Sequence, residues 1–115
     1  MKTIIAGSRN IIDYHQVTKA VEESGFQITE VVSGGANGVD KLGEHLAKAS
    51  LLHCKVFAAD WNKYGKRAGY VRNSQMAEYA EALIAVWDGK SRGTDHMIRT
   101  AKTQGLKVFV MVVRD

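Results

Sequence analysis

Five short apolar runs, separated by segments of helical periodicity, constrain the fold of this chain more than any other feature. The runs lie at residues 3–6, 30–33, 55–58, 82–87 and 108–113. Their apolar side chains follow one another directly instead of alternating with polar ones, which is typical of strands buried on both faces. The sequence therefore predicts a five-stranded, mainly parallel sheet covered by helices.

The segments between the runs predict four helices. Asp13 and Gln16 have the spacing of a capping box, and Gly25 supplies a left-handed stop. Ile12 and Val17 have the spacing of a hydrophobic staple. Because crossovers between parallel strands are right-handed, the element order favours an α/β fold, a Rossmann-like three-layer α/β/α sandwich with strand order 3-2-1-4-5. The helices are expected over residues 13–24, 38–50, 70–80 and 93–104.

The length and composition suit a single domain over residues 1–115. Apolar residues make up 45% of the chain and charged residues 24%, and no stretch approaches the roughly 18 apolar residues of a membrane-spanning helix. Nothing at the N-terminus resembles a signal peptide. The one cysteine, Cys54, is expected as a small buried residue, and the four histidines have no zinc spacing. We therefore expect a cytoplasmic protein with no metal, no cofactor and no membrane partner.

The positive charge of the chain is concentrated in one stretch. Sixteen Lys and Arg against twelve Asp and Glu give a net charge of +4, and residues 61–77 contain Lys and Arg but no acid. Trp61, Tyr64 and Tyr70 lie among these cations, and the mixture suits phosphates and flat bases. The stretch is either a lid over a bound base or a solvated loop that its aromatic rings pack down.

The loops after the first, second and fourth runs are the candidates for a ligand site, because parallel sheets bind ligands at the carboxyl ends of their strands. Their sequences are GSRN from Gly7, SGGANGVD from Ser33 and DGKSRGT from Asp88. Glycines let the backbone approach an anion, and helix N-termini attract it. Arg9 and Arg92 add guanidinium groups, which can form bidentate hydrogen bonds to phosphate. The loops therefore predict a phosphate site.

Several of these residues also have a structural interpretation. Gly34 and Gly35 fit a tight strand-to-helix turn, and Ser8 and Thr94 fit helix caps. Asp40 fits a capping carboxylate in a helix that starts at residue 37, and as a ligand contact it would suit a ribose hydroxyl rather than a phosphate. Both interpretations stay open.

Common catalytic motifs are absent from the sequence. It contains no G-x-G-x-x-G turn and no G-x-x-x-x-G-K-[ST] loop, so neither a conventional NAD-binding turn nor a phosphate-hydrolysing P-loop is supported. The metalloprotease, serine-hydrolase and dithiol patterns HExxH, GxSxG and CxxC are missing as well.

Taken together, the motifs resemble the SLOG superfamily, which includes the DNA-processing proteins Smf/DprA and the Lonely Guy phosphoribohydrolases. The set consists of GSR, SGGANGVD, AADWNKYGKRAGYVRN and WDGKSRGT in this order, and it is most similar to the small YspA-like branch of bacteria and phages. The resemblance implies a Rossmann-like domain that binds a nucleotide or a nucleotide-derived small molecule. By position it implies ligand contacts from Ser8, Arg9, Gly34, Gly35, Ala36, Gly38, Asp40, Arg72, Asn73, Met76, Ser91, Gly93 and Thr94, to which the loops and the basic stretch add Trp61, Tyr64 and Arg92.

One position departs from the Lonely Guy pattern P-G-G-x-G-T-x-x-E. Met97 stands where that pattern has its catalytic glutamate. Methionine can neither accept a proton nor stabilise an oxocarbenium ion. No catalytic residue is therefore assigned.

Three functions remain open at this stage. A sensor or sequestering protein that binds a nucleotide-derived ligand is favoured. The first alternative is a nucleotide hydrolase that cleaves an N-glycosidic or phosphoester bond with Asp40, Asp88 or Asp95 as acid or base. The second is a single-stranded DNA binder, whose affinity would fall steeply with salt. The resemblance also leaves assembly into a homo-oligomer open.

Overall fold

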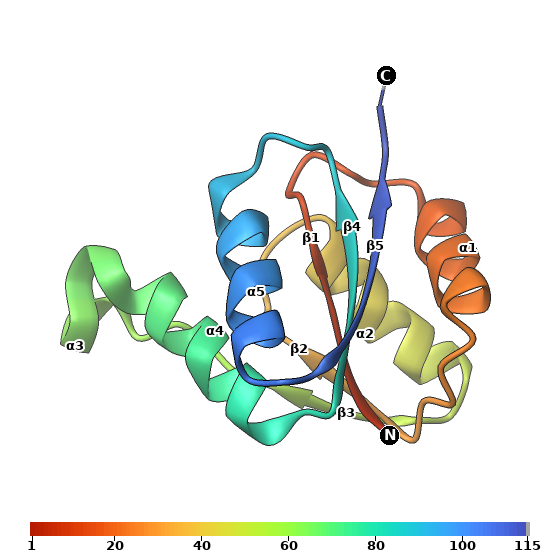
Figure 1. Ribbon diagram of the computed structural model, residues 1–115, viewed down its shortest axis with the longest axis horizontal. Helices are drawn as coiled ribbons and strands as arrows, with labels where there is room; N and C mark the ends of the chain where they lie inside the picture. The colour runs from red at the N-terminus through yellow and green to blue at the C-terminus, as the bar shows by residue number, and fades with distance from the viewer. Residues whose placement is uncertain (115) are drawn as a thin grey trace.

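The core of the molecule is a five-stranded sheet in which every neighbouring pair of strands is parallel. The computed structural model describes residues 1–114, and its strands follow the order β3-β2-β1-β4-β5 (Figure 1). This arrangement confirms the predicted Rossmann-like α/β fold and its strand order. The strands span Lys2–Gly7 (β1), Glu30–Ser33 (β2), His53–Val56 (β3), Ala82–Trp87 (β4) and Lys107–Val112 (β5).

Helices cover both faces of the sheet. Successive residues of a strand point to opposite faces, so Ile5 of β1 packs with Val39 of α2 on one side while Ile4 packs with Met76 of α4 on the other. α1 lies with α2, and α5 lies with α4 (Figure 1). The helices span Tyr14–Ser24 (α1), Val39–Ala49 (α2), Trp61–Tyr64 (α3), Ala68–Tyr79 (α4) and Arg92–Thr103 (α5), with a 3-10 turn η1 at Gly65–Arg67.

The interpretation of the apolar runs as buried strands holds for the central strands but not for the edges of the sheet. β1 and β4 are almost completely buried, whereas most of β3 is exposed. The predicted strand over residues 55–58 is wrong by two residues, and Cys54 is half-buried rather than a core residue. The apolar run extends past the end of β3 because Phe57 still packs against the core, and its N–H still donates to the Ser33 carbonyl at 2.8 Å.

The start of α1 differs in detail from its prediction. Asp13 does cap the helix, but its carboxylate accepts the N–H of His15 at 2.9 Å. Within residues 1–114 the side chain of Gln16 returns no hydrogen bond, so the cap is one-sided. The predicted hydrophobic staple is wrong, because Ile12 is 81% exposed while the preceding Ile11 takes the buried position.

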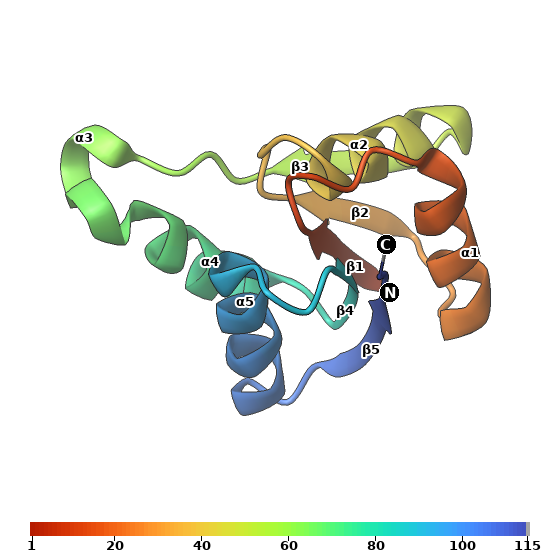
Figure 2. The same cartoon turned by 90° about the horizontal axis from the view of Figure 1, so that it is seen from above.

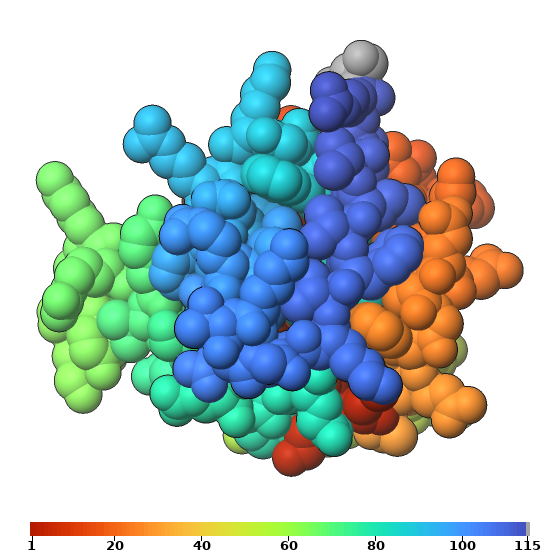
Figure 3. Space-filling view, in the orientation of Figure 1, coloured from red at the N-terminus to blue at the C-terminus, as the bar shows by residue number. Residues whose placement is uncertain are grey.

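Between β3 and β4 the chain leaves the body of the molecule and returns along α4. Residues 57–60 run outward, and α3 and η1 turn the chain back toward α5 (Figure 2). Asp60 caps α3 by accepting the Lys63 N–H at 3.0 Å. The sequence predicts a plain loop up to residue 69, and the structure forms short helices there instead. We call residues 57–67 the arm; it protrudes beside α5 in the space-filling view (Figure 3).

Gly38 lets the loops after β1 and β2 touch. Its φ of 78° and ψ of −130° suit glycine, and a Cβ there would lie 2.6 Å from the Cα and carbonyl oxygen of Arg9. The next residue, Val39, donates its N–H to the Ser8 carbonyl at 3.3 Å. Gly25 ends α1 in the predicted left-handed conformation, with φ of 69°, but a Cβ there would have no atom within 4 Å.

Alanine at these two glycines separates backbone strain from steric collision. Gly25→Ala introduces strain alone, and we expect the free energy of unfolding to fall by about 1 kcal/mol. Gly38→Ala adds a collision with the Arg9 backbone, and we expect a loss of more than about 3 kcal/mol. Urea unfolding followed by circular dichroism measures both values. Equal losses would contradict the close contact between the two loops.

Candidate functional site

A cavity of about 230 Å³ lies between the ends of the central strands, the glycine loop after β2, the arm, and helices α4 and α5. This is the edge of the sheet at which the sequence predicts a ligand. Of the residues proposed from the sequence, the cavity is lined by Arg9, Ala36, Asp40, Trp61, Arg72, Asn73, Met76, Ser91, Gly93 and Thr94. Its wall is completed by Ala6, Gly7, Lys66, Gly69, Tyr70 and Met97.

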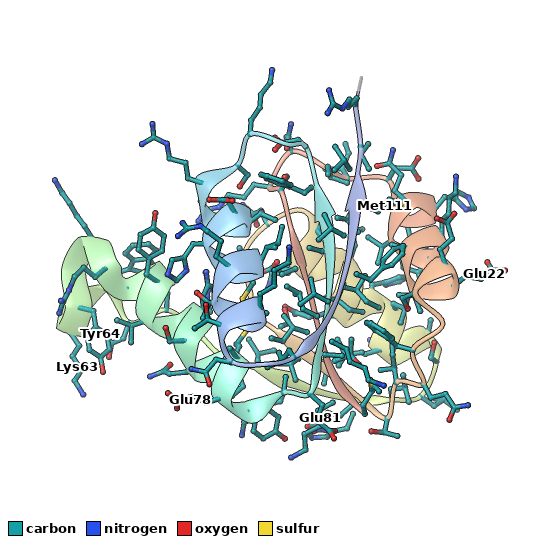
Figure 4. The ribbon with its side chains drawn as sticks, in the orientation of Figure 1. Glu22, Lys63, Tyr64, Glu78, Glu81 and Met111 are labelled. Atoms are coloured by element: carbon teal, nitrogen blue, oxygen red, sulfur yellow. The ribbon has the colours of Figure 1, made fainter. Side chains whose placement is uncertain are left out.

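Four proposed site residues lie outside both this cavity and the groove beside it. Ser8 is buried, and its Oγ accepts the Asp88 N–H at 3.0 Å, so it joins the loops after β1 and β4. Gly38 makes the loop contact described above. Tyr64 lies at the outer end of the arm (Figure 4), and Arg92 is exposed at the first turn of α5.

Six lining residues were not among the predicted ligand contacts, although Tyr70 belonged to the possible lid over the base. Lys66 and Tyr70 belong to the basic and aromatic stretch, but only the fold of the arm shows which of its side chains face the cavity. Met97 was noted as a replaced glutamate, and it is buried in the cavity wall. The composition of the stretch therefore located the region and not the individual contacts.

A groove of about 370 Å³ adjoins the cavity between the glycine loop, the end of β3 and the arm. Cavity and groove share Arg9, Ala36, Trp61 and Arg72. Gly34 and Gly35, which the sequence places in the site, line this groove instead of the cavity. Its remaining wall consists of Lys41, Val56, Ala58 and Ala59.

The glycine loop uses two of its backbone amides within the protein. The Gly35 N–H donates to Ser33 Oγ at 3.1 Å, and the Ala36 N–H donates to a carboxylate oxygen of Asp40 at 3.2 Å. Ser33 in turn donates to Glu44 at 2.7 Å. The loop is therefore held rigidly by side chains of its own region, and these two amides are not free to bind a phosphate.

Asp40 holds the glycine loop in place and forms part of the cavity wall. It lies in the first turn of α2, holds the Ala36 amide, and also lines the cavity, although its side chain and backbone together are only 5% exposed. The predicted N-cap at residue 37 is wrong, since Gly38 caps α2 without a side-chain bond. Burial raises the pKa of Asp40 from 3.8 to about 6, against the opposing effects of the Ala36 N–H and the Arg72 guanidinium.

Arg72 crosses from α4 to the glycine loop. Its Nη1 donates to the Gly34 carbonyl, and its Nε donates to Asn73 Oδ1 at 3.0 Å. Burial and the nearby Arg9 lower the pKa of the guanidinium, which Asp40 partly restores. A Cβ on Gly34 would lie 2.8 Å from this guanidinium and from the Asp40 carboxylate, so only glycine allows both groups to pack against the loop.

The lining of the cavity is positively charged on balance. Arg9 is exposed and makes no hydrogen bond or ion pair with any residue from 1 to 114. Arg72 and Lys66 add two further cations, and Asp40 contributes the one carboxylate of the lining. A cavity with this balance favours an anionic ligand.

Two aromatic rings flank the cavity. Trp61 of the arm is 55% exposed and Tyr70 of α4 is 47% exposed, which is unusual for side chains of this size. The Tyr70 ring stacks on His96 of α5, with centroids 4.1 Å apart and an interplanar angle of 14°. These rings offer flat apolar faces next to the cations of the cavity.

The structure gives no sign of a metal centre in the part of the chain that it describes. Within residues 1–114, no group of three or more His, Cys, Asp or Glu side chains is arranged to hold an ion. None of the helices in the same range has the length and apolar character needed to cross a membrane.

Comparison with known proteins identifies one relative of this chain. The Gene 61 protein of Mycobacterium phage D29 is 34% identical to it over 85 residues, and the match covers 69% of this chain and 68% of the phage protein. This chain belongs to the Gene 61 protein family. No protein-family model matches it, and no solved structure matches it significantly. The name of the Gene 61 protein describes no activity.

Asp40 gives this Gene 61 family member a predictable pH dependence of stability. The folded pKa of about 6 lies above the ordinary 3.8, so the folded chain binds the extra proton between these values and loses stability as the pH rises from about 4 to 6. The difference of about two pKa units corresponds to about 3 kcal/mol.

Asp40→Asn removes this ionisation while keeping an oxygen for the Ala36 N–H. We expect the variant to unfold with a free energy up to about 3 kcal/mol higher than the natural chain at pH 8, and with no difference near pH 4. Denaturant unfolding at the two pH values measures this. A variant that is less stable at pH 8 would show that the charged form of Asp40 is the stabilising one.

Proposed function

We propose that this protein binds a nucleotide or a nucleotide-derived small molecule in the cavity and acts as a sensor or sequestering protein. The observation that carries the proposal is the lining itself. Three cations, Arg9, Lys66 and Arg72, face a single carboxylate, and two exposed aromatic rings stand beside them. Phosphate, sugar and base together would use all of these groups.

The geometry favours a particular placement of the ligand. Since the Gly35 and Ala36 amides are already bonded, the phosphate goes to Arg9, Arg72 and the N-terminus of α5 at Gly93. The base goes against Trp61 and Tyr70. Asp40 accepts a hydrogen bond from a ribose hydroxyl, which suits a carboxylate that lies between cations.

The resemblance to the SLOG superfamily supports the same ligand class. Ten of the residues that this resemblance or the sequence proposed line one cavity, and Met97 lines it at the position of the Lonely Guy glutamate. Binding without cleavage is consistent with that replacement. We also propose that the protein is related to the YspA-like branch and comes from a bacterium or a phage. We expect it in the cytoplasm. Its possible further partners are single-stranded nucleic acid and a second copy of the chain.

One observation favours a nucleotide hydrolase as the second candidate. Of the three acids considered as catalysts, Asp40 lines the cavity, and its raised pKa of about 6 suits proton transfer. Asp88 instead accepts the N–H groups of Lys90 and Ser91, and Asp95 pairs with Arg99 at 3.0 Å. Any acid–base chemistry in this cavity would therefore fall to Asp40.

Arg9→Ala tests the binding site directly. Arg9 has no partner within residues 1–114, so its loss should leave the fold intact and weaken ADP-ribose or AMP binding at least tenfold, about 1.4 kcal/mol. Calorimetric titration measures the affinity. Arg92→Ala is the matched control, because Arg92 is also exposed but lies outside the cavity, and we expect the affinity of this variant to change less than twofold. Equal losses in both variants would place the anion elsewhere.

Incubation with AMP, ADP-ribose and NAD, followed by chromatography, separates binding from hydrolysis. We expect the nucleotides to stay intact, because the cavity wall carries Met97 where a second acid would be needed. Release of a free base or of ribose phosphate, abolished in Asp40→Asn, would instead establish the hydrolase.

A further inference from the structure

A row of hydrogen bonds connects the cavity arginine to a histidine behind it. Arg72 Nε donates to Asn73 Oδ1 at 3.0 Å, and Asn73 Nδ2 lies 3.2 Å from Nδ1 of His96 and 3.4 Å from the Gly93 carbonyl oxygen. The other ring nitrogen of His96 lies 3.5 Å from Thr100 Oγ1. The row therefore runs from α5 through α4 to the edge of the cavity.

The chemistry of its ends fixes the direction of every bond in this row. A guanidinium nitrogen can only donate, so the Asn73 atom that faces Arg72 is the oxygen. The amide nitrogen then faces the Gly93 carbonyl oxygen, which can only accept. The contact with Gly93 therefore requires the same orientation of the Asn73 amide. Because the Asn73 nitrogen is a donor, Nδ1 of His96 must be the acceptor. The imidazole is therefore neutral, with its proton on Nε2.

A protonated His96 is incompatible with this row. Both nitrogens of an imidazolium donate, so a second donor would face the Asn73 amide nitrogen. Rotating the amide would satisfy His96 but turn NH2 toward Arg72 Nε. A half-turn of the ring would place a C–H where Nδ1 was, and this Asn73 N–H would then lose its acceptor. No orientation of Asn73 satisfies both Arg72 and an imidazolium.

We propose that His96 is a positioning residue that makes anion binding in the cavity depend on pH, holding Arg72 in place when it is neutral and releasing it when it is protonated. This inference rests on the proposed function, since it concerns the affinity of the same cavity. The proposed change in anion affinity on protonation of His96 is a decrease. Electrostatics alone would give an increase, because an added positive charge near the cavity strengthens the binding of an anion.

The surroundings of His96 favour its neutral form. Burial lowers the pKa of His96, and Arg99 on the same helix lowers it further, while Asp95 opposes them. Asp95 and Arg99 are paired with each other at 3.0 Å. From α4, the groups that face the ring are Tyr70 and Asn73, with the Arg72 guanidinium behind the latter.

The test compares ADP-ribose binding at about pH 8 and about pH 5.5 in the full chain and in His96→Asn. The pyrophosphate diester of this probe keeps its charge over that range. Asparagine places an acceptor oxygen near the position of Nδ1 and does not titrate. We expect the affinity of the natural chain to fall about tenfold, relative to that of His96→Asn, when the pH is lowered from about 8 to about 5.5.

Asp40 also titrates in this range, but it is present in both proteins, so the comparison isolates His96. Tighter or unchanged binding by the natural chain at pH 5.5 relative to His96→Asn would overturn the proposal. The Arg72 Nε–H signal in NMR gives a second readout that needs no ligand. Its pH titration should contain a step in the natural chain that is missing from His96→Asn, and identical titrations in the two proteins would overturn the proposal as well.

These readouts also separate the two proposals. If ADP-ribose binds at neither pH while the Arg72 signal follows His96, the choice of ligand is wrong and the coupling of His96 to Arg72 stands. If ADP-ribose binds equally at both pH values in both proteins and the Arg72 signal does not move, the binding site stands and the coupling is wrong.

Discussion

The guanidinium of Arg72 joins two layers of this molecule across the candidate site. It starts from α4 on one face of the sheet and donates to the Gly34 carbonyl in the loop that leads to α2 on the other face. Asp40 lies against the same loop and partly balances its charge. Even a partly buried cation is costly unless it is paired and hydrogen-bonded. The shape of the cavity therefore depends on this one contact and on the glycine that leaves room for it.

The hydrogen bonds within the protein also determine which donors of the cavity are left for an anion. The amides of Gly35 and Ala36 already bind Ser33 and Asp40, which makes the glycine loop rigid but removes two donors. For the proposed phosphate this leaves the N-terminus of α5 and charged side chains, of which Arg9 is free of partners within residues 1–114. Such a site gains affinity from preorganised charge more than from a cradle of backbone amides.

Much of the fold could be predicted from the sequence, because burial in parallel strands leaves a continuous apolar signal. That signal is strong in β1 and β4, which have neighbours on both sides, and weak in the edge strand β3. The prediction for β3 accordingly missed its position. Ile12 shows a similar limit: its spacing fits a staple, but the preceding residue, Ile11, occupies the buried position instead.

The sequence predicted where the candidate site lies better than it predicted the contacts that the residues of the site make. The three loops converge as expected, since the strand order alone brings their ends together. The bond of Ser8 to Asp88 joins segments 80 residues apart, which no local pattern encodes. The bond of Asp40 to Ala36 is local, but it depends on the path that the glycine loop takes before α2. The fold of the arm likewise decides that Trp61 and Tyr70 line the cavity while Tyr64 does not.

The central claim is that the cavity binds a phosphorylated nucleoside, and an NMR titration of the isotope-labelled protein with ADP-ribose tests it most directly. The account predicts that the amide signals of Ala36, Tyr70 and Gly93, which come from three separate elements around one cavity, move together and saturate together. Movement confined to the exposed edge of β3, or no movement with ADP-ribose, AMP or NAD, would contradict it.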